Sequence, residues 1–110
     1  MTEVTAHCAC GAHAIDLPGP PPHITICFCV DCQLRTGGPF AIATYYESAN
    51  LMLPVLVVRR RYADSGRWLD DHHCPECGVV LFYTTEWKDG VVGIPLGLLR
   101  GYEHLPPDRA

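Results

Sequence analysis

Seven cysteines grouped in three short clusters constrain this chain more than any other feature. The clusters are Cys8-Ala9-Cys10-Gly11, Cys27-Phe28-Cys29-Val30-Asp31-Cys32 and Cys74-Pro75-Glu76-Cys77-Gly78. An odd number of cysteines argues against a closed set of disulfides. Two cysteines separated by one residue also cannot comfortably reach disulfide geometry with each other. Metal ligation therefore explains the clusters better than disulfide bonding.

The two outer clusters predict one zinc site. Zinc takes four ligands in a tetrahedron, with thiolate sulfur at about 2.3 Å. Cys74 and Cys77 have the spacing of a zinc knuckle, which supplies only two ligands, so we expect Cys8 and Cys10 to supply the others. Such a site closes a long loop, where restraint of the unfolded chain is most effective. The alternative is four buried thiols without a metal.

The central cluster predicts a second zinc with one free coordination position. It offers Cys27, Cys29 and Cys32, and no fourth cysteine remains. Structural zinc sites are closed, whereas catalytic sites keep a position open. Three thiolates and Zn²⁺ leave a net charge of about −1, which makes a weaker Lewis acid that suits a sulfur ligand. We therefore predict a thiol substrate rather than simple hydrolysis.

Two alternatives remain open for the central cluster. A histidine would close the site, and the candidates are His23, His72 and His73. A redox pair of Cys29 and Cys32 is less satisfactory because it leaves Cys27 unexplained. For the histidines in general we expect surface positions, with His72 and His73 in a solvated turn; the others in this group are His7, His13 and His104.

The remaining pattern predicts a single, mostly β domain over residues 1–110. Short apolar or β-branched runs bounded by glycine, proline and asparagine are typical of strands. We expect strands over 13–17, 24–26, 40–46, 55–62, 79–83 and 91–94 and a helical turn over 31–36. Asp89-Gly90 predicts a hairpin turn. A small zinc-stapled β domain with short helical turns is the expected fold.

Composition and charge exclude some partners. The 110 residues carry a net charge of −4, which disfavours nucleic acid as a ligand. The run Arg59–Arg61 is the only basic cluster, and we interpret it either as a solvated strand face or as an anchor for an acidic ligand. No apolar run approaches the roughly 20 residues of a membrane span. The first residues lack the pattern of a signal peptide, so we expect a cytoplasmic location.

Taken together, the three clusters resemble the glutathione-dependent formaldehyde-activating enzyme family, which includes the centromere protein V group. The likeness extends from about residue 6 to residue 98 and includes Arg35-Thr36-Gly37-Gly38-Pro39-Phe40 after the central cluster and Leu81-Phe82 after the knuckle. The resemblance implies a β-tent fold with two zinc ions. It assigns the outer cysteines to a structural site and the central ones to a catalytic site. Departures from the family pattern are Gln33 after the third central cysteine, Asp-Asp-His-His before the knuckle, and the end of the chain at Ala110.

The resemblance also implies carbon–sulfur lyase chemistry, with glutathione and formaldehyde giving S-hydroxymethylglutathione or a related thiol adduct. Expected partners are therefore a small thiol and an aldehyde, with no nucleic acid and no membrane; a homodimer is kept as an option. We expect Thr36 and the amides of Gly37 and Gly38 to face the developing alkoxide, Phe40 to form a pocket wall, and Arg35 to anchor a carboxylate. The alternatives are a non-catalytic zinc scaffold that binds a protein, or a zinc-thiolate redox sensor.

Overall fold

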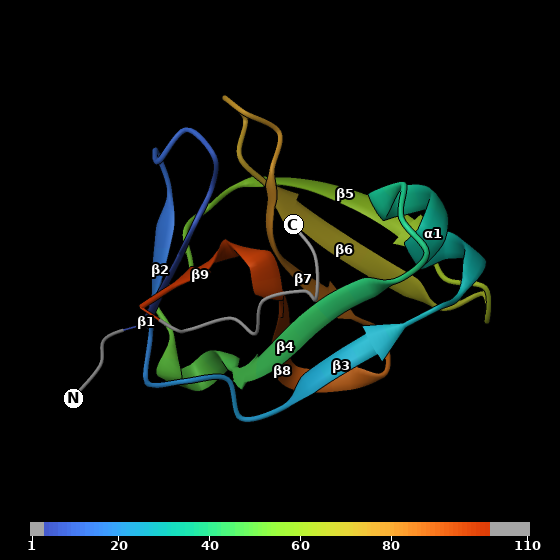
Figure 1. Ribbon diagram of the computed structural model, residues 1–110, viewed down its shortest axis with the longest axis horizontal. Helices are drawn as coiled ribbons and strands as arrows, with labels where there is room; N and C mark the ends of the chain where they lie inside the picture. The colour runs from blue at the N-terminus through green and yellow to red at the C-terminus, as the bar shows by residue number, and fades with distance from the viewer. Residues whose placement is uncertain (1–3, 102–110) are drawn as a thin grey trace, which may run out of the picture.

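Two antiparallel sheets dominate the fold of residues 4–101, the part of the chain that the computed structural model describes (Figure 1). The smaller sheet has the order β2-β1-β9, with β1 at Val4–His7, β2 at Ala14–Leu17 and β9 at Leu99–Arg100. The larger sheet has the order β3-β4-β8-β7-β6-β5. Its strands are β3 (Ile24–Cys27), β4 (Ala41–Glu47), β5 (Val57–Tyr62), β6 (Trp68–His73), β7 (Val80–Thr85) and β8 (Lys88–Pro95). The expectation of a mainly β fold is confirmed.

The helical content is small and local. Within the described residues, α1 (Val30–Thr36) is the α-helix, and η1 (Ser48–Asn50) and η2 (Leu96–Leu98) are single turns. In Figure 1, α1 follows β3 at the end of the large sheet that lies away from the small sheet. None of the described helices is long and apolar enough to cross a membrane.

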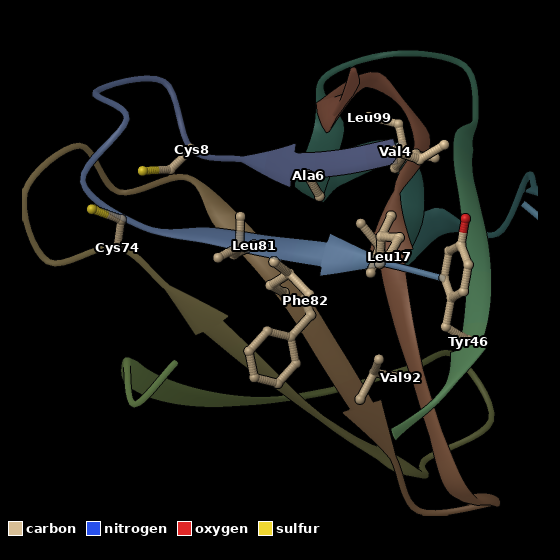
Figure 2. Packing of buried hydrophobic residues seen from close by; sticks show 12 residues of the cluster. Val4, Ala6, Cys8, Leu17, Tyr46, Cys74, Leu81, Phe82, Val92 and Leu99 are labelled. Carbon is tan, nitrogen blue, oxygen red and sulfur yellow. The ribbon is translucent and has the colours of Figure 1, made fainter. Parts of the chain in front are cut away.

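The main core lies where the two sheets pack together. Alternate residues of β1 and β2 point into it, because successive side chains on a strand face opposite sides. Val4, Ala6 and Ile15 are nearly or fully buried there, and they pack in the same cluster as Leu81 and Ile94 of the large sheet. Figure 2 shows Val4, Ala6 and Leu81 of this cluster. Each buried aliphatic side chain contributes roughly 1.5–3 kcal/mol. The small sheet therefore covers one face of the large sheet.

The opposite face of the large sheet carries a second cluster. Ala43, Leu69 and Tyr83 are buried there, with Tyr45 packed against them. Gly93 makes room for this cluster, because a Cβ built at residue 93 would lie 2.4 Å from Cζ of Tyr83. The Tyr83 ring consequently lies directly on the backbone of β8. This second face is the one that meets the central cysteines.

Several sequence predictions need correction. Strands β1, β6 and β9 were not expected, and His72 and His73 belong to β6 rather than to a solvated turn. Strand β6 is polar, but it pairs with β5 so that Arg60 and Arg61 meet Asp70 and Asp71. Ion pairs between these strands, rather than apolar alternation, accompany its pairing, so the hydrophobic pattern does not reveal it.

The hairpin between β7 and β8 also differs from the prediction. Its turn is at Glu86 and Trp87, not at Asp89-Gly90. Gly90 instead lies within β8 with φ of 77°, where the pairing with β7 shifts register. A glycine in the left-handed region is also what a β-bulge requires, so the same dipeptide signal serves a bulge here.

Candidate metal centres

The structure brings the four outer cysteines into one cluster. The four sulfurs all lie within 4.8 Å of one another; they belong to Cys8, Cys10, Cys74 and Cys77. Cys8 follows β1, and Cys74 follows β6, so the cluster joins the small sheet to the large one. Figure 2 shows Cys8 and Cys74 at the edge of the core, with their sulfurs on the same side. Both residues are fully buried.

The spacing of these sulfurs fits zinc. A tetrahedron with metal–sulfur bonds of about 2.3 Å has edges of about 3.8 Å. The sulfur of Cys10 lies 3.6 Å from that of Cys8 and 3.7 Å from that of Cys74. Gly11 and Gly78 both have positive φ, at 77° and 79°, where each of the two cysteine loops ends. Backbone donors also favour thiolate here, since the amide of Val79 is the main cause of a Cys77 pKa lowered to about 6.

The structure brings the three central cysteines into a separate cluster. Cys27 ends β3, Cys29 precedes α1 and Cys32 lies in its first turn. Their sulfurs all lie within 4.8 Å of one another, and those of Cys27 and Cys29 are 3.3 Å apart. Close packing of three thiols from one short segment is a suitable arrangement for a soft metal ion.

The central cluster has three sulfur ligands and no fourth among residues 4–101. No histidine nitrogen, carboxylate oxygen or further thiol of these residues joins the three sulfurs within 4.8 Å. Of the histidines considered for closing the site, His72 stacks on Phe82 with ring centroids 4.2 Å apart, and burial lowers its pKa. His23 is exposed and lines a hollow elsewhere on the sheet. The histidine-closed alternative therefore has no support in the described part of the chain.

Helix α1 supports the cluster through its N-terminus. The Cys29 side chain caps the helix by accepting from the Cys32 amide at 3.4 Å. Asp64, from the turn between β5 and β6, accepts from the Val30 amide at 2.9 Å and the Asp31 amide at 3.1 Å. Asp31 in turn pairs with Arg61. These contacts fix the start of the helix, and with it two of the three sulfurs, against the large sheet.

The electrostatic environment separates the three thiols. The backbone amide of Cys29 is the largest influence on Cys27 and holds the pKa of that thiol below its ordinary value. Cys32 is only 9% exposed, and burial, reinforced by the neighbouring thiols, raises its pKa to about 12. Arg35 opposes this rise, since its Nη2 lies 3.9 Å from the Cys32 sulfur. Nε of Arg35 is buried without a hydrogen-bond partner, so the guanidinium retains donor capacity beside the cluster.

The loop after α1 holds its own hydrogen-bonding groups. The Thr36 hydroxyl donates to the Cys32 carbonyl at 2.9 Å and accepts from the Gly38 amide at 3.1 Å. The Gly37 amide donates to the Gln33 carbonyl at 2.8 Å, and Gly37 has φ of 71° as the helix C-cap. The amides of Gly37 and Gly38, which we expected to face a substrate, are thus engaged within the loop.

Two aromatic side chains lie close to the central cysteines in sequence. Phe28 and Phe40 lie on either side of the helix in sequence, and their ring centroids are 5.6 Å apart. Phe28 is 65% exposed and Phe40 is 37% exposed. Two exposed aromatic rings that contact each other offer an apolar surface in the segments next to the central cysteines.

The arginine run divides between the two faces of β5. Arg60 pairs with Asp70 at 2.8 Å and lies over the Trp68 ring. Arg61 pairs with Asp31 and Asp71, and its carboxylate partners leave it little capacity for a ligand. Arg59 is exposed and has no salt bridge among the described residues. Of the remaining histidines, His7 and His13 are partly exposed, and His104 lies outside the described residues.

Sequence reasoning missed a line of side chains that leads away from the cluster. Arg35 lies 6.0 Å from the Tyr83 ring centroid, and the Tyr83 hydroxyl is 3.0 Å from that of Tyr45. Nζ of Lys88 lies 3.6 Å from the Tyr45 ring centroid. Burial raises the pKa of Tyr83, so its hydroxyl stays protonated. These residues come from β4, β7, β8 and α1, and only strand pairing could have brought them together.

Comparison with known proteins adds one match. The family model described as glutathione-dependent formaldehyde-activating enzyme matches residues 3–110, which is nearly the whole chain. The comparison with curated proteins finds no match.

Proposed function

The chain belongs to the glutathione-dependent formaldehyde-activating enzyme family, and from this premise we propose that it is a zinc-dependent carbon–sulfur lyase. Family membership supports a role in activating formaldehyde with glutathione. The finer proposal is that the chain joins the glutathione thiol to formaldehyde, giving S-hydroxymethylglutathione, or acts on a closely related thiol adduct. We assign this activity to residues 1–110 acting as one domain.

The observation that carries the proposal is the incomplete ligand set at Cys27, Cys29 and Cys32. Three sulfurs meet within 4.8 Å, and no other ligand atom of residues 4–101 joins them. A zinc ion held there would supply a Lewis-acid centre with room for one more sulfur, which lowers the pKa of a bound thiol. The outer cysteines, by contrast, form a complete set of four and are assigned to a structural zinc.

The reaction requires little from the protein besides orientation and charge. The substrate sulfur attacks the carbonyl carbon of the aldehyde, so one carbon–sulfur bond forms while the carbonyl π bond breaks. The thiol proton ends on the aldehyde oxygen, and no oxidant or reductant is needed. Holding both reactants in contact supplies a large part of such an acceleration.

The residues around the cluster are assigned roles from their contacts. Arg35 lies beside the Cys32 sulfur and offers an unpartnered Nε, so it would stabilise negative charge on the bound thiolate. Phe28 and Phe40 would shield the reacting atoms from water. Thr36, Gly37 and Gly38 would act by holding the shape of the loop, because their own hydrogen bonds already lie within it.

An exchange experiment tests this function. Glutathione and ¹³C-formaldehyde are mixed with the zinc-loaded protein, and the rate of adduct formation is measured by NMR exchange spectroscopy. We expect an acceleration that depends on protein concentration and that a Cys29→Ser variant lacks. If zinc-loaded protein leaves the exchange rate at the uncatalysed value, the lyase proposal fails and a non-catalytic zinc scaffold becomes the better reading.

A further inference from the structure

A hollow lies on the large sheet over β3, β4 and the β7–β8 hairpin, away from the central cysteines themselves. Its volume is 650 Å³, within the range of sites for small ligands, and it is lined in part by Thr25, Tyr45, Trp87, Lys88 and Asp89. Thr25 is two residues from the end of β3, where the central cluster starts. The near side of the hollow therefore lies about 7 Å along β3 from Cys27.

Strand register places this hollow on the same sheet face as the cluster. Cys27 pairs with Ala41, and Thr25 pairs with Ala43, so these four side chains share one face. Tyr45 lies two residues beyond Ala43 and packs against the hydrophobic cluster that contains Ala43. A ligand attached at the central sulfurs would thus extend along this face without crossing the sheet.

The distance suits a peptide thiol. From Ala41, opposite Cys27, to Tyr45 is four residues, which is about 13 Å along a strand. The thiol of a peptide such as glutathione is on the central residue, so either end group lies within about 7 Å of that residue. Thr25 is two residues from Cys27, also about 7 Å along the strand, so such an end group would reach the Thr25 side of the hollow.

The far end of the hollow carries both charges. The Lys88 ammonium lies over the Tyr45 ring, and a cation–π contact of this kind orients the cation without neutralising it. Asp89 lines the same hollow. Neither residue forms a salt bridge with any residue between 4 and 101. A cation and an anion that line one hollow, neither with a salt bridge, match the carboxylate and ammonium of an amino-acid end group.

Tyr45 is itself held in place, which makes Lys88 a positioned group. Its hydroxyl is bonded to that of Tyr83, and its ring meets the Tyr83 ring edge-on. Tyr83 in turn lies on Gly93, where any larger residue would clash. The chain therefore fixes the ring that orients the Lys88 ammonium.

A second hollow near the cluster is a weaker candidate for this role. It measures 390 Å³ and is lined by Arg35, Arg59 and Arg61, but also by Asp31 and Asp71. Arg61 already pairs with both of those carboxylates. Part of the positive charge in this hollow is therefore already paired with protein carboxylates, whereas Lys88 forms no salt bridge within residues 4–101.

We propose that the hollow over Thr25 and Tyr45 binds the amino-acid end of a peptide thiol, with Lys88 receiving its carboxylate and Asp89 its ammonium. The inference rests on the proposed function and adds to it a basis for selecting among thiols. The γ-glutamyl end of glutathione carries this pair of groups. The same hollow gives no advantage to a thiol without charged ends.

The test compares substrates in Lys88 variants. In Lys88→Met, which keeps the side-chain stem over the Tyr45 ring, we expect KM for γ-glutamylcysteine to rise about tenfold, with kcat little changed. KM for 2-mercaptoethanol should not change. Lys88→Arg should restore most of the affinity, and Arg100→Met, an exposed cation on β9 of the other sheet, should have no effect. An equal rise for both thiols, or no rise for either, overturns the proposal.

A binding measurement separates this inference from the proposed activity. S-methylglutathione has no free thiol and cannot form the adduct, so its binding is measured apart from the reaction. Titration calorimetry should detect binding to the native protein that weakens about tenfold in Lys88→Met and recovers in Lys88→Arg. Absence of binding, or binding indifferent to Lys88, overturns the inference even if exchange is catalysed. Lys88-dependent binding without catalysed exchange would instead retain the hollow and reject the lyase activity.

Discussion

The two cysteine clusters use the same atoms in opposite structural settings. The outer cluster draws on two distant segments, since 64 residues separate Cys10 from Cys74. Its cysteines lie at the core between the two sheets. Cys27, Cys29 and Cys32 come from one short segment at the end of an outer strand of the large sheet and the start of a short helix. Sequence separation therefore distinguishes a cluster that connects two sheets from one that is formed within a single local segment.

Burial and ligand count point in the same direction as sequence separation. Cys8 and Cys74 are fully buried, and their cluster contains the four sulfurs of a closed zinc site. The central cluster has three sulfurs, and residues close to it in sequence, such as Phe28 and Leu34, are exposed. A metal in the first setting mainly restrains the chain, whereas a metal in the second setting remains accessible to a ligand. Four predictions test this contrast.

Breaking the outer cluster should have the largest effect. In Cys74→Ser we expect loss of the folded state, because zinc contributes on the order of 10 kcal/mol in small metal domains, comparable with a domain's whole stability of about 5–15 kcal/mol. Far-ultraviolet circular dichroism and metal content per chain measure the result. A folded Cys74→Ser protein with an unchanged melting temperature would contradict the structural assignment of this cluster.

Breaking the central cluster should remove activity and leave the fold. Cys29→Ser is the matched change, because serine is itself a good N-cap and can still accept from the Cys32 amide. We expect loss of one zinc per chain, a fall in exchange activity of at least about 100-fold, and a melting temperature within about 5 °C of the native value. Unfolding of this variant would mean that the central metal is structural too.

The sequence was sufficient for the division of the cysteines but not for the surroundings of each cluster. Ligand number and spacing grouped the sulfurs in the same way that the structure groups them. The family likeness likewise pointed to the mainly β fold. Both inferences depend on local sequence patterns or on the count of one residue type, and these can be applied without a structure.

The missed features all depend on strand pairing. Strand β6 has no apolar alternation because cross-strand ion pairs accompany its pairing with β5. Asp64 reads as an ordinary turn residue, yet it caps a helix that starts 34 residues earlier. Lys88 and Tyr45 are far apart in sequence and meet only because β8 pairs with β4. No local pattern encodes these contacts.

The contact between Gly93 and Tyr83 lies on the face of the large sheet that meets the central cysteines, opposite the main core. In Gly93→Ala the new Cβ would lie 2.4 Å from the Tyr83 ring, which must then shift. We expect a loss of about 1–3 kcal/mol in unfolding free energy, as for overpacking, together with a higher KM for glutathione. Denaturant unfolding and exchange kinetics measure the two effects.

Gly97→Ala is the control for this change, because nothing lies within 4 Å of a Cβ at residue 97 and its φ is not in the left-handed region. Its stability and KM should stay close to native. If Gly93→Ala behaves like Gly97→Ala, the Tyr83 ring tolerates displacement and does not position the substrate face.

The smallest effect should come from the contact that fixes α1. Asp64→Ala removes the acceptor of the Val30 and Asp31 amides, and loss of such a cap costs about 0.5–2 kcal/mol. Because the helix carries Cys32 and is capped by Cys29, zinc affinity at the central cluster should fall, by about tenfold, while the outer cluster keeps its metal. Competition with a chromophoric chelator resolves the two affinities. Asp64→Asn keeps an acceptor oxygen and should lose less, and Asp16→Ala, an exposed carboxylate of the small sheet, should lose nothing at either site. Equal weakening of both sites in Asp64→Ala would mean that the clusters are coupled through the fold, because a purely local helix contact acts on one cluster alone.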